Sequence, residues 1–246
     1  MWPLTDQDWT ALTANGEEIT LATGEQLDRI QHLAHAEPVL RSAFLGVTHL
    51  GLESVHRRSL LDEQPIRILA IPGSLRRHSY NTMLLETARQ LAQPPVEVDV
   101  FDGAGQIPLF NQDSEGDLTP SPVLELRTRI RTSDAILIAS PEYNGSITGV
   151  LKNLIDWASR PYGQSAFAGK PVSVIGASPS RFGALYSQQT TIGVLTSAEA
   201  TVVGGPHPVK RVFRLVDSEG RIGDARTLSM LSGVLAELSS AVGLDT

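Results

Sequence analysis

Residues 135–139 read Ala-Ile-Leu-Ile-Ala, and the predicted fold class follows from this segment. Five apolar residues in a row, without polar alternation, predict a strand that is covered on both faces. Strands of this kind belong to parallel sheets with helices on both sides. A polar, turn-rich segment from Ser140 to Gly149 follows, and a helical pattern then runs from about Gly149 to Ser159. These three segments form one strand–loop–helix unit.

The same alternation extends outward from this unit in both directions. Short β-branched runs predict four more strands, and amphipathic spacing predicts helices between them. The expected strands are 66–71, 96–101, 172–176 and 200–203, of which 96–101 is an edge strand because apolar and acidic residues alternate in it. The expected helices are 81–91, 123–131, 185–195 and 228–242, with a long loop over 102–122 and a small hairpin over 209–222 that turns at 217–220. The pattern predicts an α/β fold with an open, doubly wound parallel sheet.

Residues 1–64 do not continue this pattern. They hold ten acidic and four basic residues, so they carry most of the net charge of -7. Two short helices are expected over 26–36 and 39–50, and we predict a helical N-terminal extension over 1–64 before the sheet domain of 65–246. His32, His35 and the pair Glu53 and His56 have spacings seen at metal sites, but one Glu-x-x-His unit is not enough for a di-iron centre. Solvated histidines are the favoured interpretation, and no metal site is predicted.

The composition excludes several classes of protein. The chain has no cysteine, which rules out disulfides, iron–sulfur clusters and thiol nucleophiles, so redox chemistry would need a bound cofactor. The negative net charge argues against a general nucleic-acid-binding protein. No signal peptide and no run of about 18 apolar residues is seen, so we predict a soluble cytoplasmic protein without a membrane partner.

The loop after the first strand, residues 73–81, has the composition of an anion-binding cradle. Ser74, Ser79 and Asn81 carry short hydrogen-bonding side chains, and Arg76 adds a positive charge. The helix that begins here adds free N–H groups and a favourable dipole. The loop lacks both the Rossmann glycine pattern and the P-loop Gly-Lys-Ser/Thr. The alternative is an ordinary helix cap followed by a surface arginine.

The loop after the central strand completes a specific pair of motifs. Pro-Glu-Tyr-Asn-Gly-Ser at 141–146 precedes Leu-Lys-Asn-x-Ile-Asp-Trp at 151–157, and both follow Gly-Ser-Leu-Arg-x-x-Ser-x-Asn at 73–81. In this order the motifs resemble the NADPH-dependent FMN reductase family, over about residues 65–245. The resemblance implies a flavodoxin-like sheet of five strands in the order 2-1-3-4-5, with FMN as the cofactor and NADPH or NADH as the co-substrate.

The resemblance also assigns residues to the FMN site. The cofactor-binding residues it implies are Ser74, Arg76, Ser79, Tyr80 and Asn81 around the phosphate, Pro141, Glu142, Tyr143, Asn144 and Gly145 along the isoalloxazine, and Ala177, Ser178 and Ser180 at its pyrimidine edge. The third group matches the family less closely, because Pro179 and Arg181 stand where small residues are common. For Tyr143 the alternative is a turn aromatic that packs on the following helix. No side chain is expected to act as a catalytic acid or base, because the flavin carries the chemistry.

The implied activity is hydride transfer from NAD(P)H to FMN, followed by electron transfer to a small acceptor such as a quinone, azo compound, metal oxyanion or free flavin. The rivals are a flavodoxin-type electron carrier and a non-catalytic FMN-binding subunit. A carrier is expected to surround its flavin with acidic residues, whereas residues 65–246 are nearly neutral. The resemblance to this family also implies that the chain forms a homodimer or homotetramer. Lys210, Arg211 and Arg214 are read as a solvated hairpin face, with contact to nicotinamide-nucleotide phosphates as the alternative.

Overall fold

The computed structural model describes residues 65–242. The two helices expected over 26–36 and 39–50, and the histidines among residues 32–56, lie outside the described residues. The division of the chain at residue 64 therefore stays a prediction. No helix in the described part is long and apolar enough to cross a membrane.

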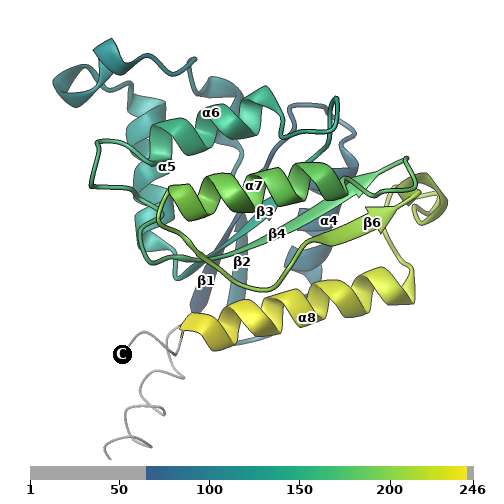
Figure 1. Ribbon diagram of the computed structural model, residues 1–246. Helices are drawn as coiled ribbons and strands as arrows, with labels where there is room; N and C mark the ends of the chain where they lie inside the picture. Colours follow the sequence, from purple (N-terminus) through teal and green to yellow (C-terminus); the bar gives the residue numbers. More distant parts are fainter. Residues whose placement is uncertain (1–64, 243–246) are drawn as a thin grey trace, which may run out of the picture. The chain divides into compact units, whose positions relative to one another are not determined.

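One sheet of six parallel strands forms the centre of the described domain (Figure 1). The strands are β1 Ile66–Pro72, β2 Val96–Val100, β3 Ala135–Ala139, β4 Pro171–Ser178, β5 Thr201–Val202 and β6 His207–Lys210. Their order is β2-β1-β3-β4-β5, which confirms the predicted doubly wound topology, and β6 is added beside β4. The sequence predicted five strands, so β6 is the element that it missed.

Two short strands share the outer edge of β4. β5 pairs with Pro171 and Val172 at the start of β4, whereas β6 pairs with the segment from Ile175 to Ser178 at its end. The hairpin predicted over 209–222 is therefore wrong, since its first residues belong to β6 and pair in parallel with β4. Only an isolated bridge between Val216 and Ile222 closes the expected turn, in which Gly220 has a φ of 78°.

Five helices cover the two faces of the sheet (Figure 1). They are α4 Tyr80–Leu91, α5 Ser121–Thr132, α6 Gly149–Ala158, α7 Leu185–Ser197 and α8 Ala225–Val242. α5, α6 and α7 pack on one face, and α4 and α8 on the other. The connection between β2 and α5, predicted as a long loop, contains three 3-10 turns, η2 Gly103–Gln106, η3 Gln112–Ser114 and η4 Gly116–Leu118.

β3 is the central strand that its sequence predicts. All five of its residues are buried. Ile136 and Ile138 face the core under α5 and α6, whereas Ala135, Leu137 and Ala139 face the core under α4 and α8. Successive side chains of a strand point to opposite faces, so a strand buried on both faces needs an unbroken apolar run.

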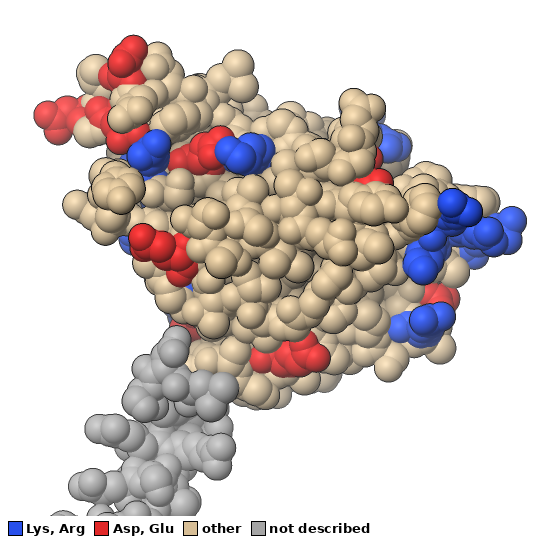
Figure 2. All heavy atoms as spheres, viewed as in Figure 1, with Lys and Arg blue, Asp and Glu red and all other residues tan. Residues whose placement is uncertain are grey.

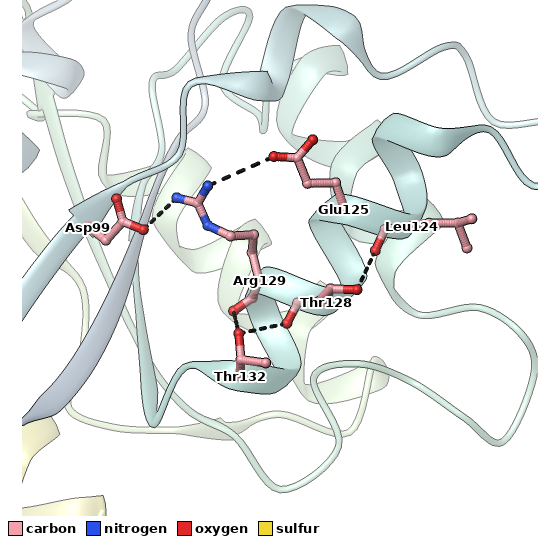
Figure 3. Close-up of polar contacts among 6 residues, drawn as sticks. All are labelled: Asp99, Leu124, Glu125, Thr128, Arg129 and Thr132. Atoms are coloured by element: carbon pink, nitrogen blue, oxygen red, sulfur yellow. Dashed lines mark hydrogen bonds and ion pairs between the residues drawn. The ribbon is translucent and has the colours of Figure 1, made fainter. Parts of the chain in front are cut away.

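β2 is an edge strand, as its acidic alternation predicted. Figure 3 shows how α5 is joined to it: the Arg129 guanidinium lies 2.5 Å from the Asp99 carboxylate and 4.0 Å from Glu125. The Thr128 and Thr132 hydroxyls bond back to carbonyls of their own helix. A groove of about 830 Å³ lies here, along the whole of β2 and the first half of β1. Its lining contains none of the predicted site residues.

Candidate functional site

The three loops singled out in the sequence meet at the carboxyl-terminal edge of the sheet. β1, β3 and β4 are neighbours, so the loops that follow them lie next to one another. The Gly73 N–H donates to the Ala139 carbonyl at 2.9 Å, and the Thr148 hydroxyl donates to the Gly73 carbonyl at 2.7 Å. A Cβ at Gly73 would lie 2.8 Å from Cδ of Pro141. Glycine therefore allows the first two loops to pack directly on each other.

The first loop presents unpaired donors around the start of α4. Ser79 caps the helix, since its Oγ accepts from the Thr82 N–H at 3.4 Å. The backbone N–H groups of Tyr80 and Asn81 have no partner among residues 65–242. Ser74 accepts from the Arg76 N–H at 3.3 Å, and the Arg76 side chain is exposed. A helix N-terminus with free N–H groups and a nearby arginine suits a phosphate.

Asn81 joins the first loop to β4. Its Nδ2 donates to the Ala177 carbonyl at 3.0 Å, and its Oδ1 accepts from the Ala177 N–H at 2.9 Å. Both residues are buried. The side chain that the sequence assigned to a phosphate is thus engaged with β4, with one amide hydrogen left over. The Ala177 backbone N–H is therefore already engaged, and the placement of Ala177 at the pyrimidine edge stays a prediction.

The second loop contains a tight turn that exposes an aromatic ring. Tyr143 and Ser146 exchange backbone hydrogen bonds at 3.3 and 3.1 Å, and Asn144 and Gly145 both have positive φ, 54° and 71°. This is the type I′ geometry that Asn-Gly favours. Tyr143 is 51% exposed, so about half of its surface is open to a ligand. The turn offers a flat apolar surface beside the first loop.

Glu142 has a role that the sequence did not indicate. One carboxylate oxygen accepts from the backbone N–H groups of Tyr186 at 2.9 Å and Ser187 at 3.2 Å. The residue before α7 is Ala184, which has a φ of 63° and no capping side chain. Glu142 therefore caps α7 from a distant loop and holds the second loop against the third. The sequence did contain a signal for this role, because the residue before Leu185 is not Ser, Thr, Asp or Asn and cannot cap α7 itself.

We expect Glu142→Ala to lower the free energy of unfolding by about 1–2 kcal/mol, because two N–H groups at a helix start lose their charged acceptor. Urea denaturation measures this loss. The matched control is Glu125→Ala on α5, whose carboxylate makes only a 4.0 Å contact with Arg129 and whose loss is expected to cost less than about 0.5 kcal/mol. Equal stability of the two variants would contradict the capping role.

The third loop is shaped by its own serines. β4 runs to Ser178, whose Oγ accepts from the Ser180 N–H at 3.1 Å, and the Ser180 Oγ accepts from the Phe182 N–H at 3.2 Å. Gly183 has a φ of 62°, and a Cβ there would lie 2.8 Å from the Val209 carbonyl carbon. The loop therefore packs directly on the backbone of β6. Ser178 and Ser180 lie in the predicted region, but their hydroxyls order the loop.

Buried polar side chains behind the loops form networks that the sequence analysis missed. Ser140 Oγ contacts Ser187 Oγ at 2.6 Å and Thr191 Oγ1 at 2.9 Å, and Ser187 donates to the Pro141 carbonyl at 2.7 Å. Gln188 donates to the Gly183 carbonyl at 3.1 Å. These contacts anchor the second and third loops to α7. Isolated Ser, Thr and Gln residues in a helix carry no sequence signal of such a network.

His207 links β6 to this arrangement and titrates abnormally. Its backbone N–H donates to Gln188 Oε1 at 2.7 Å. Burial lowers the pKa of its imidazole below the ordinary value, although the nearby Glu237 carboxylate opposes this. Nε2 has no hydrogen-bond partner among the described residues. The folded protein therefore holds this imidazole neutral in conditions in which the unfolded chain already protonates it.

We expect this difference to make stability fall with pH below about 6.5. The unfolded chain binds the proton first, so stability is complete above the unfolded pKa and declines below it, by no more than about 1.4 kcal/mol per pH unit for one group. Urea denaturation of the wild type and His207→Gln from pH 7.5 to 5 measures the effect as the difference between their profiles. Parallel profiles would show that His207 does not titrate differently in the two states.

Comparisons with known proteins agree with one another. The sequence model of the NADPH-dependent FMN reductase family matches residues 66–211. An NAD(P)H-dependent FMN reductase of Pseudomonas aeruginosa is 38% identical over 174 residues, covering 70% of this chain and 93% of the relative. A quinone reductase of Pseudomonas putida is 42% identical over 183 residues, covering 74% and 97%. The solved structure of FerB, a flavoenzyme NAD(P)H:(acceptor) oxidoreductase of Paracoccus denitrificans, matches with 33% identity and a TM-score of 0.64, covering 72% and 97%.

Proposed function

The chain belongs to the NADPH-dependent FMN reductase family, and from this premise we propose that it reduces quinones with electrons from NAD(P)H. It is an FMN-dependent NAD(P)H oxidoreductase. The observation that carries the proposed site is the meeting of an anion cradle, an exposed aromatic turn and a backbone-lined loop at one edge of the sheet. These are the three surfaces that a phosphate-bearing planar cofactor needs.

The donor set of the loops fits FMN. The terminal phosphate needs donors and positive charge, which Ser74, Arg76 and the free N–H groups of Tyr80 and Asn81 supply. FMN fits better than FAD because this cradle suits a terminal phosphate dianion. Bound at these residues, FMN would supply the hydride-accepting and two-electron-transfer chemistry that the side chains lack.

We assign the walls of the ring site to the second and third loops. Pro141 and Tyr143 offer apolar surface, and the positive-φ turn at Asn144 and Gly145 keeps the tyrosine exposed. On the other side, the Arg181 backbone N–H has no partner among residues 65–242. A donor at the pyrimidine edge would stabilise negative charge on the ring. Glu142 and Asn81 hold the loops in place.

Steady-state oxidation of NADPH by the FMN-loaded protein, with a benzoquinone as the acceptor and without oxygen, tests this proposal. We expect turnover with one FMN per chain. A yellow protein that takes up electrons only from a reduced protein partner would favour the electron carrier. A protein without flavin absorbance, after incubation with FMN, would favour a non-catalytic subunit. Azo compounds, metal oxyanions and free flavin, tested in the same assay, would reveal a different preferred acceptor.

We also propose that the chain acts as a homodimer or homotetramer. In support, Leu109, Leu118 and Tyr162 are large hydrophobic side chains that are largely exposed on the described domain.

The family match begins at residue 66, which supports an extension over 1–64 that holds no redox chemistry. That extension is proposed to cover or extend the assembly. The cytoplasmic location stays a prediction.

A further inference from the structure

A group of exposed cations lies in and beside the third loop, and their charged side chains have no part in the site assigned above. This basic cluster consists of Arg181, Lys210, Arg211 and Arg214. None of the four forms an ion pair with another residue of the described range 65–242. Figure 2 shows Lys and Arg side chains gathered at the end of the domain where β4 and β6 finish. Four uncompensated charges in so small an area are expected to attract an anion.

The backbone holds this cluster in a set position relative to the third loop. Lys210 is the register partner of Ser178 at the end of β4. The Arg211 N–H donates to the Ser180 carbonyl at 3.1 Å, and Arg211 itself has a φ of 49°. Gly183 lies against the β6 backbone, as described above. A ligand that reaches the third loop therefore meets the cluster without any change in the fold.

Aromatic rings lie among the cations. The Arg181 guanidinium lies 4.6 Å from the centre of the Phe182 ring, and the Phe182 and Tyr186 rings are 5.4 Å apart. Phe213 is 50% exposed, and the Arg214 guanidinium lies 5.6 Å from its ring centre. Guanidinium planes and aromatic rings are surfaces on which a purine can stack. The combination suits a ligand with a purine base and several phosphates.

We propose that the basic cluster binds the adenosine end of NADPH and uses the 2′-phosphate to select NADPH over NADH. This inference rests on the proposed function, because it adds a subsite for the same reductant. NADPH differs from NADH by one phosphate, a nearly dianionic group that arginine binds with charge-assisted hydrogen bonds. The FMN phosphate is assigned to the first loop, so the cluster remains for the second nucleotide. A nucleic acid fits less well, since the whole chain carries a net charge of -7.

Neutral variants of the FMN-loaded protein test the proposal. Arg211→Gln and Lys210→Gln remove one cation each and leave the backbone contacts in place. We expect each to lower the NADPH/NADH ratio of kcat/KM, and Arg211→Gln by about tenfold, because a charge-assisted contact to the 2′-phosphate is lost. The matched control is Arg89→Gln on the last turn of α4, which is paired with Glu86 and lines the groove at the opposite edge of the sheet. It removes the same charge and is expected to leave the ratio unchanged.

Binding of 2′,5′-ADP and 5′-ADP to the same proteins, measured by calorimetry, separates the 2′-phosphate from the rest of the nucleotide. We expect the wild type to bind 2′,5′-ADP at least about tenfold more tightly, and Arg211→Gln to lose most of this difference. Equal binding of the two nucleotides, or equal losses for NADPH and NADH in both variants, would overturn the proposal. Wild-type turnover with a bound FMN would then still support the proposed function, so the two failures are distinguishable.

Discussion

Asn81→Leu is expected to lower the free energy of unfolding by about 2–5 kcal/mol and to weaken FMN binding as well. Leucine nearly matches the shape of asparagine but leaves the buried N–H and carbonyl of Ala177 without partners. Each unsatisfied buried group costs about 1–3 kcal/mol. Because Asn81 connects the start of α4 to β4, the first loop also loses its anchor. Urea denaturation and FMN titration measure the two effects.

Thr87→Val on the same helix is the matched control. The Thr87 hydroxyl is also largely buried, but it donates only to the Met83 carbonyl of its own helix. That carbonyl keeps its helical partner in the variant, so the expected loss is below about 1 kcal/mol. If Asn81→Leu is no less stable than Thr87→Val, the connection to β4 contributes little to the fold.

Arg76→Ala is expected to weaken FMN binding ten- to a hundred-fold with little change in stability. Arg76 is exposed in the first loop, where the only described hydrogen bond of the residue runs from its backbone to Ser74, and its proposed role is a charge-assisted bond to the terminal phosphate. Bonds of this kind contribute about 1.5–3 kcal/mol, which gives the stated range. Quenching of flavin fluorescence during titration of the apoprotein measures the dissociation constant.

Riboflavin, which lacks the phosphate, provides the internal control for this experiment. Its affinity is expected to be equal in the wild type and in Arg76→Ala, because the ring site is unchanged. Arg77→Ala, at the neighbouring exposed arginine, is expected to cost much less FMN affinity than Arg76→Ala. A variant at Arg76 that binds FMN as tightly as the wild type would remove the phosphate assignment.

The parts of the fold that local patterns specify were predictable from the sequence. The unbroken apolar run of β3 and the acidic alternation of β2 report burial directly, and both strands lie where expected. β6 was not predictable, because His-Pro-Val-Lys carries no strand pattern and its pairing depends on the position of β4. Tertiary contacts decide such short edge segments.

The candidate site was likewise only partly predictable from the sequence. The sequence could locate the three loops, because turn residues after buried strands identify them, but it could not say what each side chain contacts. Glu142 and Asn81 both belong to the motifs that resemble the family. In the structure, however, Glu142 caps α7 and Asn81 joins the first loop to β4. Such contacts join residues that are 44 and 96 positions apart, a separation at which no local pattern operates.

Two different short strands pair with the outer edge of β4, and they have different roles. β5 pairs with the start of β4, whereas β6 pairs with the end of β4 and carries Lys210, directly before Arg211 of the basic cluster. Mutations in β6 and the turn after it can therefore alter ligand preference while the pairing of β5 preserves the sheet. The proposed nucleotide preference and the pairing at the start of β4 thus depend on different segments of this edge, so substitutions between Lys210 and Arg214 are expected to change one without the other.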